Sequence, residues 1–156
     1  MRWLWLLVLL PFHYAAAETI SGRVVAVLDG DTLTVLDAAQ RRHNIDLAEI
    51  DAPEPKQAFG MQSARSLARL CFKKQAEVEW REKTPGKRAL GRVTCAGVEA
   101  NAEQVRRGMA WASPRATQPG SPLYELEAYA RLRGIGLWKG SQPVAPWEWR
   151  AAQRAR

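Results

Sequence analysis

The sequence predicts one α+β domain in which a small five-stranded β-barrel is joined to about three helices. Its 156 residues are enough for a single domain with its own core. Segments with strand composition, separated by turn residues, fill the first half of the chain, and segments with helical periodicity interrupt and follow them. A barrel is the economical closure for five short strands because it leaves little open edge.

Five segments have the composition of strands. The valine-rich segment from Ile20 leads into Asp29-Gly30-Asp31, a turn signal between two β-rich runs. Ala38-Ala39-Gln40 predicts the next hairpin turn. Later, apolar residues alternate with polar ones around Val78, which is typical of a half-buried strand. The predicted strands cover 20–28, 32–36, 41–50, 76–80 and 90–95.

Helical patterns occur once between the strands and again after them. In residues 61–72 the apolar positions recur at three- and four-residue steps. Asn101 with Gln104 predicts a capping box at the start of a short helix. Ser121, followed by proline, is a typical cap for a last helix that ends at Gly134. We expect the tryptophans of the tail to pack back on the body: Trp138, Trp147 and Trp149.

Residues 1–17 are predicted to be a signal peptide. A positive start precedes an apolar run from Trp3 to Leu10, and three alanines then offer a cleavage site. The run is shorter than the roughly 20 residues of a membrane span; an uncleaved membrane anchor is the alternative. We expect residues 18–150 to form the domain, secreted or periplasmic, monomeric and without stable membrane association, and residues 151–156 to form a frayed basic tail.

Charge and cysteine content add two expectations. The formal net charge of +7 favours polyanionic partners such as nucleic acid, through steering and counterion release. Cys71 and Cys95 are an even pair in an exported chain, which predicts a disulfide bond between them. The alternative is two buried free thiols.

Carboxylates are the groups that offer chemistry. Past the signal peptide His43 is the only histidine, which excludes a multi-histidine zinc site and leaves no Ser-His-Asp triad. Acidic residues cluster in Asp29-Gly30-Asp31 and in Asp51-Ala52-Pro53-Glu54. If these clusters converge, they suit Ca²⁺ or Mg²⁺, with a further carboxylate as general base for water. Arg92 is a candidate phosphate contact. The alternative is that both clusters are ordinary turns.

Six motifs occur in a particular order and cover nearly all of the mature chain. They are Asp-Gly-Asp-Thr at 29–32, Ile-Asp-Ala-Pro-Glu at 50–54, Gly-Arg at 91–92, the segment 101–111, Gly-Ile-Gly-Leu-Trp at 134–138 and Pro-Trp-Glu-Trp at 146–149. In this order they resemble the staphylococcal (thermo)nuclease family. The resemblance implies an OB-fold barrel and Ca²⁺-dependent cleavage of DNA and RNA phosphodiesters.

The resemblance also implies a role for each matching residue. Asp31 and Asp51 match the two metal-binding aspartates of the family. Ala52 stands where the family supplies a backbone carbonyl to the metal. Glu54 matches the glutamate assigned as general base, and Arg92 matches an arginine that contacts the scissile phosphate.

Two departures from the family pattern concern arginine. The family has Arg-Leu-x-x-Ile-Asp before Pro-Glu, and Asp46 stands here in the place of that arginine. The family's Asp-Arg/Lys-Tyr-Gly-Arg appears as Arg88-Ala-Leu-Gly-Arg92. Arg41, Arg42 and Arg88 are candidates to replace the missing cation, and we expect reduced activity. The alternatives are a catalytically weak OB-fold protein that binds nucleic acid, or an exported interaction domain without a nucleic-acid role.

Overall fold

The computed structural model describes residues 18–82, 88–140 and 142–155. The predicted signal peptide lies outside the described residues. None of the helices in these three ranges combines the length and the hydrophobicity that a membrane span needs.

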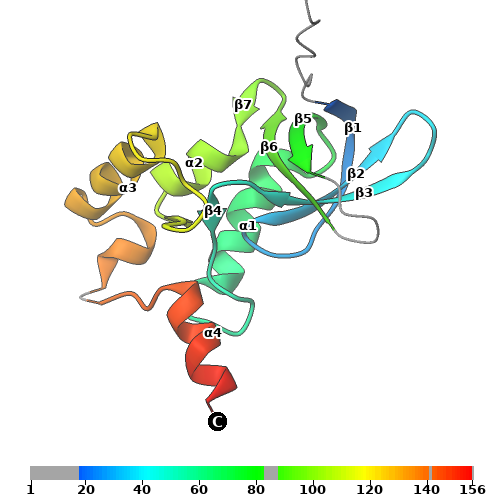
Figure 1. The fold of residues 1–156 in the computed structure, drawn as a ribbon. Helices are drawn as coiled ribbons and strands as arrows, with labels where there is room; N and C mark the ends of the chain where they lie inside the picture. The colour runs from blue at the N-terminus through cyan, green and yellow to red at the C-terminus, as the bar shows by residue number, and fades with distance from the viewer. Residues whose placement is uncertain (1–17, 83–87, 141, 156) are drawn as a thin grey trace, which may run out of the picture.

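The body of the molecule is a closed five-stranded barrel of mixed direction (Figure 1). Four neighbouring pairs of strands are antiparallel, and β3 pairs with β6 in parallel, which closes the sheet on itself. The predicted five-stranded α+β barrel is therefore confirmed. The barrel strands are β1 (Glu18–Val27), β2 (Thr32–Asp37), β3 (Arg42–Leu47), β5 (Gln75–Glu82) and β6 (Ala89–Cys95).

The interior of the barrel is filled by β-branched and leucine side chains from alternate strand positions. This alternation is what the period of two in a strand requires when one face is buried. The following residues have no exposed surface: Val24, Leu33, Val35, Ile45, Val78 and Val93.

The third predicted strand is broken in the structure. It was expected to run over 41–50, but β3 ends at Leu47, and a separate short strand, β4 (Ile50–Asp51), pairs with β8 (Trp111–Ala112). Glu49 lies between them with φ at 64°, a left-handed conformation that ends an extended strand. Consequently Asp51 belongs to a second sheet that faces the helical half of the molecule.

The described residues contain four α-helices and one short 3₁₀ helix. α1 lies against the barrel, α2 and α3 pack side by side, and α4 extends from the end of the molecule (Figure 1). They are α1 (Gly60–Cys71), α2 (Ala100–Arg106), which follows the short strand β7 (Val98–Glu99), α3 (Pro122–Leu132), η1 (Gly136–Lys139) and α4 (Pro146–Arg154). α4 continues past residue 150 into the segment that we expected to be a frayed tail.

The capping box predicted at α2 is absent, and the two polar residues have another task. Asn101 is 2% exposed; its Oδ1 accepts from the backbone N–H of Val93, and its Nδ2 donates to Ala48 O at 2.9 Å. Gln104 is fully buried and donates from Nε2 to Gly30 O at 2.7 Å. Since buried polar groups need partners, these side chains fix α2 onto the barrel strands.

A second, smaller core holds the C-terminal segment. Trp111 packs edge-on against Trp138 and Trp147, with ring centroids 5.4 and 6.4 Å apart. Leu137 and Ala145 are buried in the same cluster. Trp138 and Trp147 thus pack back on the body as predicted, and they anchor the start of α4 beside the barrel.

A disulfide bond joins Cys71 at the end of α1 to Cys95 at the end of β6. The predicted pairing is confirmed. Both residues are fully buried in the main core. The bond therefore ties the helix that covers the barrel to one of the two strands that close it.

We expect loss of this bond to lower the free energy of unfolding by about 3.5 kcal/mol, the chain-entropy value for two cysteines 24 positions apart. Urea denaturation of the wild type, with and without reductant, measures it. The Cys71→Ala/Cys95→Ala variant should match the reduced wild type and should not respond to reductant. Equal stability of oxidised and reduced protein would contradict the expectation.

Candidate functional site

A cavity of about 270 Å³ opens at the end of the barrel beside α4. Five carboxylates and two arginines line it, together with backbone and apolar groups of the first turn and of β4, and we call it the acidic cavity. Its charged residues are Asp29, Asp31, Asp46, Asp51, Glu54, Arg88 and Arg150.

The first acidic motif forms the turn between β1 and β2. Asp29 accepts the backbone N–H of Asp31 at its Oδ1, which tightens the turn. A Cβ on Gly30 would lie 1.8 Å from Ser63 Oγ, so that only glycine lets the turn approach α1 this closely. Gln104 holds the same glycine by its carbonyl. The turn is thus fixed by α1 and α2 from outside the barrel.

The two acidic motifs meet directly. The backbone N–H of Ala52 donates to Asp31 Oδ2 at 2.6 Å, although the two residues are 21 positions apart. Asp31 and Asp51, the two predicted metal ligands, and Ala52 therefore stand at one site. The expected convergence of the clusters is observed.

Asp31 carries an unusual protonation equilibrium. Burial raises its pKa from 3.8 to about 8, and the hydrogen bond to Asp29 and the charges of Asp29 and Asp51 act in the same direction. The hydrogen bond from the Ala52 N–H opposes the shift. A cation bound beside the carboxylate would favour its ionised form and so lower this pKa.

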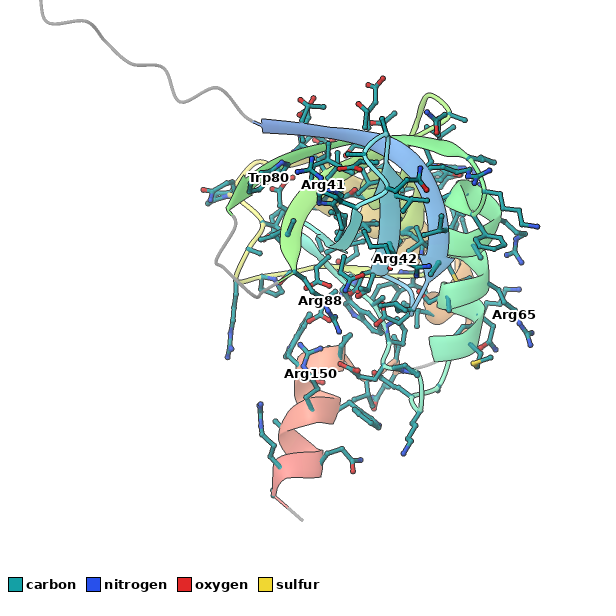
Figure 2. All side chains as sticks on the ribbon, turned by 90° about the vertical axis from the view of Figure 1, so that its right-hand side faces the viewer. Arg41, Arg42, Arg65, Trp80, Arg88 and Arg150 are labelled. Atoms are coloured by element: carbon teal, nitrogen blue, oxygen red, sulfur yellow. A yellow bond between two sulfur atoms is a disulfide. The ribbon has the colours of Figure 1, made fainter. Side chains whose placement is uncertain are left out.

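Arg150 from α4 spans the other two predicted functional carboxylates. Its Nη1 and Nη2 donate to the two oxygens of Asp51 at 3.0 and 2.7 Å, and Nη1 also reaches Glu54 Oε1 at 2.8 Å. These bonds raise the pKa of the guanidinium above its ordinary value, with the bond to Asp51 as the main cause. Figure 2 shows Arg150 on α4, at the same end of the barrel as Arg88.

Sequence reasoning missed Arg150 because it found no pattern that links the end of the domain to the acidic motifs. A usable signal was present. Pro146 fits the first turn of a helix, and in a helix beginning there Arg150 is one turn further on. The contact to Asp51 spans 99 positions, which no local pattern reveals.

Glu54 is positioned by the turn that follows it. Its backbone N–H donates to Gln57 Oε1 at 3.1 Å, and its carbonyl accepts the N–H of Gln57 at 2.8 Å. Gln57 in turn donates to Val144 O at 2.6 Å. The turn is therefore linked to the segment that precedes α4, which carries Arg150.

Arg92 lies apart from the acidic cavity. Its Nη2 donates to Glu49 Oε2 at 2.8 Å, and its Nε is 3.5 Å from Glu99. It lines a neighbouring cavity of about 560 Å³ beside the loop that contains Pro119. Leu90 borders both cavities. The structure thus brings Asp31, Asp51, Ala52 and Glu54 together in the acidic cavity, and it places Arg92 in the neighbouring cavity.

Of the three arginines considered as replacements at position 46, one reaches the cavity. Arg88 Nη1 donates to Asp46 Oδ1 at 3.1 Å. Arg41 instead pairs with Asp37 at 2.9 Å. Arg42 is exposed at the start of β3 and does not line the acidic cavity.

The donor set suits a hard divalent cation in its chemistry, because carboxylate and carbonyl oxygens are the ligands that Ca²⁺ prefers. Burial is the main cause of the raised pKa of Asp31, and the neighbouring charges of Asp29 and Asp51 add to it; a cation would counteract these charges. Among the described residues, no three side chains of the metal-binding types are close enough together to hold an ion. A cation would therefore rely on Asp31, Asp51 and backbone oxygen, and Arg150 would have to yield Asp51.

The shift at Asp31 predicts a pH dependence of stability in EDTA. Between about pH 4 and pH 8 the folded protein retains a proton that the unfolded chain releases, so that Asp31 stabilises the fold fully below pH 4 and loses this effect as the pH rises to 8. Asp31→Asn should flatten the fall of Tm over this range, whereas Glu77→Gln on the exposed face of β5 should not. Parallel curves for wild type and Asp31→Asn would contradict the assignment.

Sequence comparisons identify relatives over most of the chain. A "Micrococcal nuclease" of Shigella flexneri is 38% identical over 144 residues, covering 85% of this chain and 82% of the relative. Proteins named "Uncharacterized endonuclease" are 35% identical in Haemophilus influenzae, over 96% of this chain and 83% of the relative, and 40% identical in Escherichia coli O157:H7, over 84% and 85%.

The family described as "Staphylococcal nuclease homologue" matches residues 44–140, which include β4, α1 and α2. This match covers more than half of the chain, and the similarity to the Haemophilus influenzae protein extends it on both sides. The barrel and the convergence of the two acidic motifs agree with the resemblance found in the sequence. The chain belongs to the staphylococcal nuclease family.

Proposed function

We propose that the protein is an exported, Ca²⁺-dependent nuclease that hydrolyses phosphodiester bonds of DNA or RNA. The observation that carries the proposal is the convergence of Asp31, Asp51 and Glu54 in one cavity of a chain from a nuclease family. The disulfide supports export, because such bonds persist in oxidising compartments. The relative named micrococcal nuclease supports the reaction class.

In this proposal each residue has one task. Asp31, Asp51 and the Ala52 carbonyl hold the cation, which supplies charge stabilisation at a phosphate oxygen. Glu54 accepts a proton from the attacking water at a carboxylate oxygen. Arg92 donates to the phosphate from the neighbouring cavity, once it exchanges Glu49 for the substrate.

The contacts of Arg150 favour one alternative, a catalytically weak protein that binds nucleic acid. As long as Arg150 holds Glu54 and Asp51, the proposed base and one proposed ligand are both engaged. The two functions differ in a single respect: the nuclease requires that Ca²⁺ and substrate displace these bonds. A cleavage assay therefore separates them.

The first test is calcium binding. We expect isothermal titration of the wild type with CaCl₂ to show a site that is lost in Asp31→Asn/Asp51→Asn, because the pair supplies both charged ligands. The control Glu77→Gln/Glu125→Gln removes the same formal charge from exposed positions on β5 and α3. Binding that persists in the first variant would place the ion elsewhere.

The second test is cleavage of a short single-stranded DNA in Ca²⁺ or in EDTA. We expect cleavage in Ca²⁺ alone, and a loss of about 10²–10⁴-fold in rate for Glu54→Gln, the usual contribution of a general base. Glu125→Gln on α3 serves as control. If the wild type binds the DNA and leaves it intact in Ca²⁺, the weak binding protein is the correct alternative.

A further inference from the structure

Arg88 and Asp46 form an ion pair on the wall of the acidic cavity. Arg88 Nη1 donates to Asp46 Oδ1 at 3.1 Å, and both residues line the cavity with Asp31 and Asp51. They come from the two strands that close the barrel, since Asp46 lies in β3 and Arg88 immediately precedes β6. The parallel register pairs Asp46 with Leu90 and so places Arg88 within two positions of Asp46 along the paired strands. Figure 2 shows Arg88 at the end of the barrel that faces α4.

Asp46 is a fixed anchor for this arginine. Thr32 is only 2% exposed and donates from its hydroxyl to Asp46 Oδ1 at 3.1 Å. The same hydroxyl lies 3.3 Å from Asp31 Oδ1. The buried hydroxyl of Thr32 thus lies between two carboxylates: that of Asp46, which holds Arg88, and that of Asp31, which is proposed to hold the cation.

Arg88 keeps donors free for a ligand. Its side chain is 51% exposed, and within the described part of the chain the bond to Asp46 is the one contact recorded for its guanidinium. A guanidinium carries five N–H donors in a planar fork that matches phosphate oxygens. By contrast, Arg150 uses two nitrogens on Asp51 and Glu54, and Arg92 pairs with Glu49 outside the cavity.

The sequence agrees with an exchange of charge between these two positions. Asp46 stands where the family pattern has arginine, and Arg88 stands where it has aspartate. Asp46 replaces a positive charge of the family pattern by a negative one, and Arg88 replaces a negative charge by a positive one. In the structure the two residues are in contact, so that the cavity retains one cation and one anion at this wall.

We propose that Arg88, positioned by Asp46, is a catalytic arginine of the acidic cavity and binds the non-bridging oxygens of the substrate phosphate. The proposal rests on the proposed nuclease function. Asp46 is then the positioning residue for Arg88. The positive side chain that the family pattern has at position 46 is here supplied by Arg88, immediately before β6.

The experiment compares variants by kcat and KM on a short single-stranded DNA in Ca²⁺. Arg88→Gln should lower kcat/KM by about 10²–10³-fold, mostly in kcat, as expected when a donor to developing charge is removed. Arg88→Lys should recover part of the loss, because it keeps the charge and loses the fork. The matched control is Arg41→Gln, which removes another exposed arginine paired with an aspartate, at the β2–β3 turn.

A charge-exchange pair tests the role of Asp46. Arg88→Asp should be less active than Arg88→Gln, and Asp46→Arg/Arg88→Asp should regain at least about tenfold over Arg88→Asp, since it returns a cation to the same wall. Thermal unfolding of every variant shows whether a loss of activity follows a loss of stability. Equal activity of Arg88→Gln and Arg41→Gln, or no recovery in the exchanged variant, would overturn the proposal.

A second readout keeps this proposal distinct from the proposed function. Fluorescence anisotropy with a fluorescein-labelled ten-nucleotide DNA measures the Kd in Ca²⁺, in the Glu54→Gln background or in the wild type if that does not cleave. Arg88→Gln should weaken binding more than Arg41→Gln does. If the wild type leaves DNA intact, the nuclease function fails, and the comparison of these two Kd values still decides whether Arg88 binds phosphate.

Discussion

The parallel pairing of β3 with β6 is the contact on which the rest of the structure depends. It is the one parallel pair in the barrel, and it joins segments that are separated in the chain by β4, α1 and β5. Gly91, the partner of Leu47 in this pairing, also lets β6 approach β5 closely, because a Cβ there would lie 2.6 Å from Val78 Cγ1. Closing the barrel in this register brings Arg88 to Asp46 and leaves Arg92 on the side of Glu49. The two arginines therefore serve two cavities.

Excess negative charge governs the acidic cavity. Two features reduce this charge. The pKa of Asp31 is raised to about 8, and Arg150 donates hydrogen bonds to both Asp51 and Glu54. The proposed cation would have to displace a proton from Asp31 and the guanidinium of Arg150 from Asp51. Arg150 lies on α4, whose first turn is anchored by the tryptophan cluster, so that the proposed cation would compete with a contact made by this helix.

The fold and half of the site follow from local patterns, and the remainder depends on contacts between distant segments. Strand composition, turn residues and the helical period predict the barrel and α1, and the two acidic motifs are visible as sequence. Nothing in the sequence around Glu49 indicates its left-handed backbone conformation, which divides the third predicted strand. Asn101 and Gln104 have the spacing of a capping box, yet both are buried and donate hydrogen bonds to backbone carbonyls at the end of the barrel. The place of Arg150 depends on packing of the last helix, which only tertiary structure sets.

The bond between Cys71 and Cys95 makes the stability of the protein depend on whether its compartment is oxidising or reducing. In a reducing cytoplasm the thiols stay apart, and the strand that carries Arg92 loses its covalent tie to α1. A difference of about 3.5 kcal/mol changes the ratio of folded to unfolded chains by about 300-fold. Under the proposed function, a nuclease would thus be least stable in the compartment that holds the nucleic acid of its own cell.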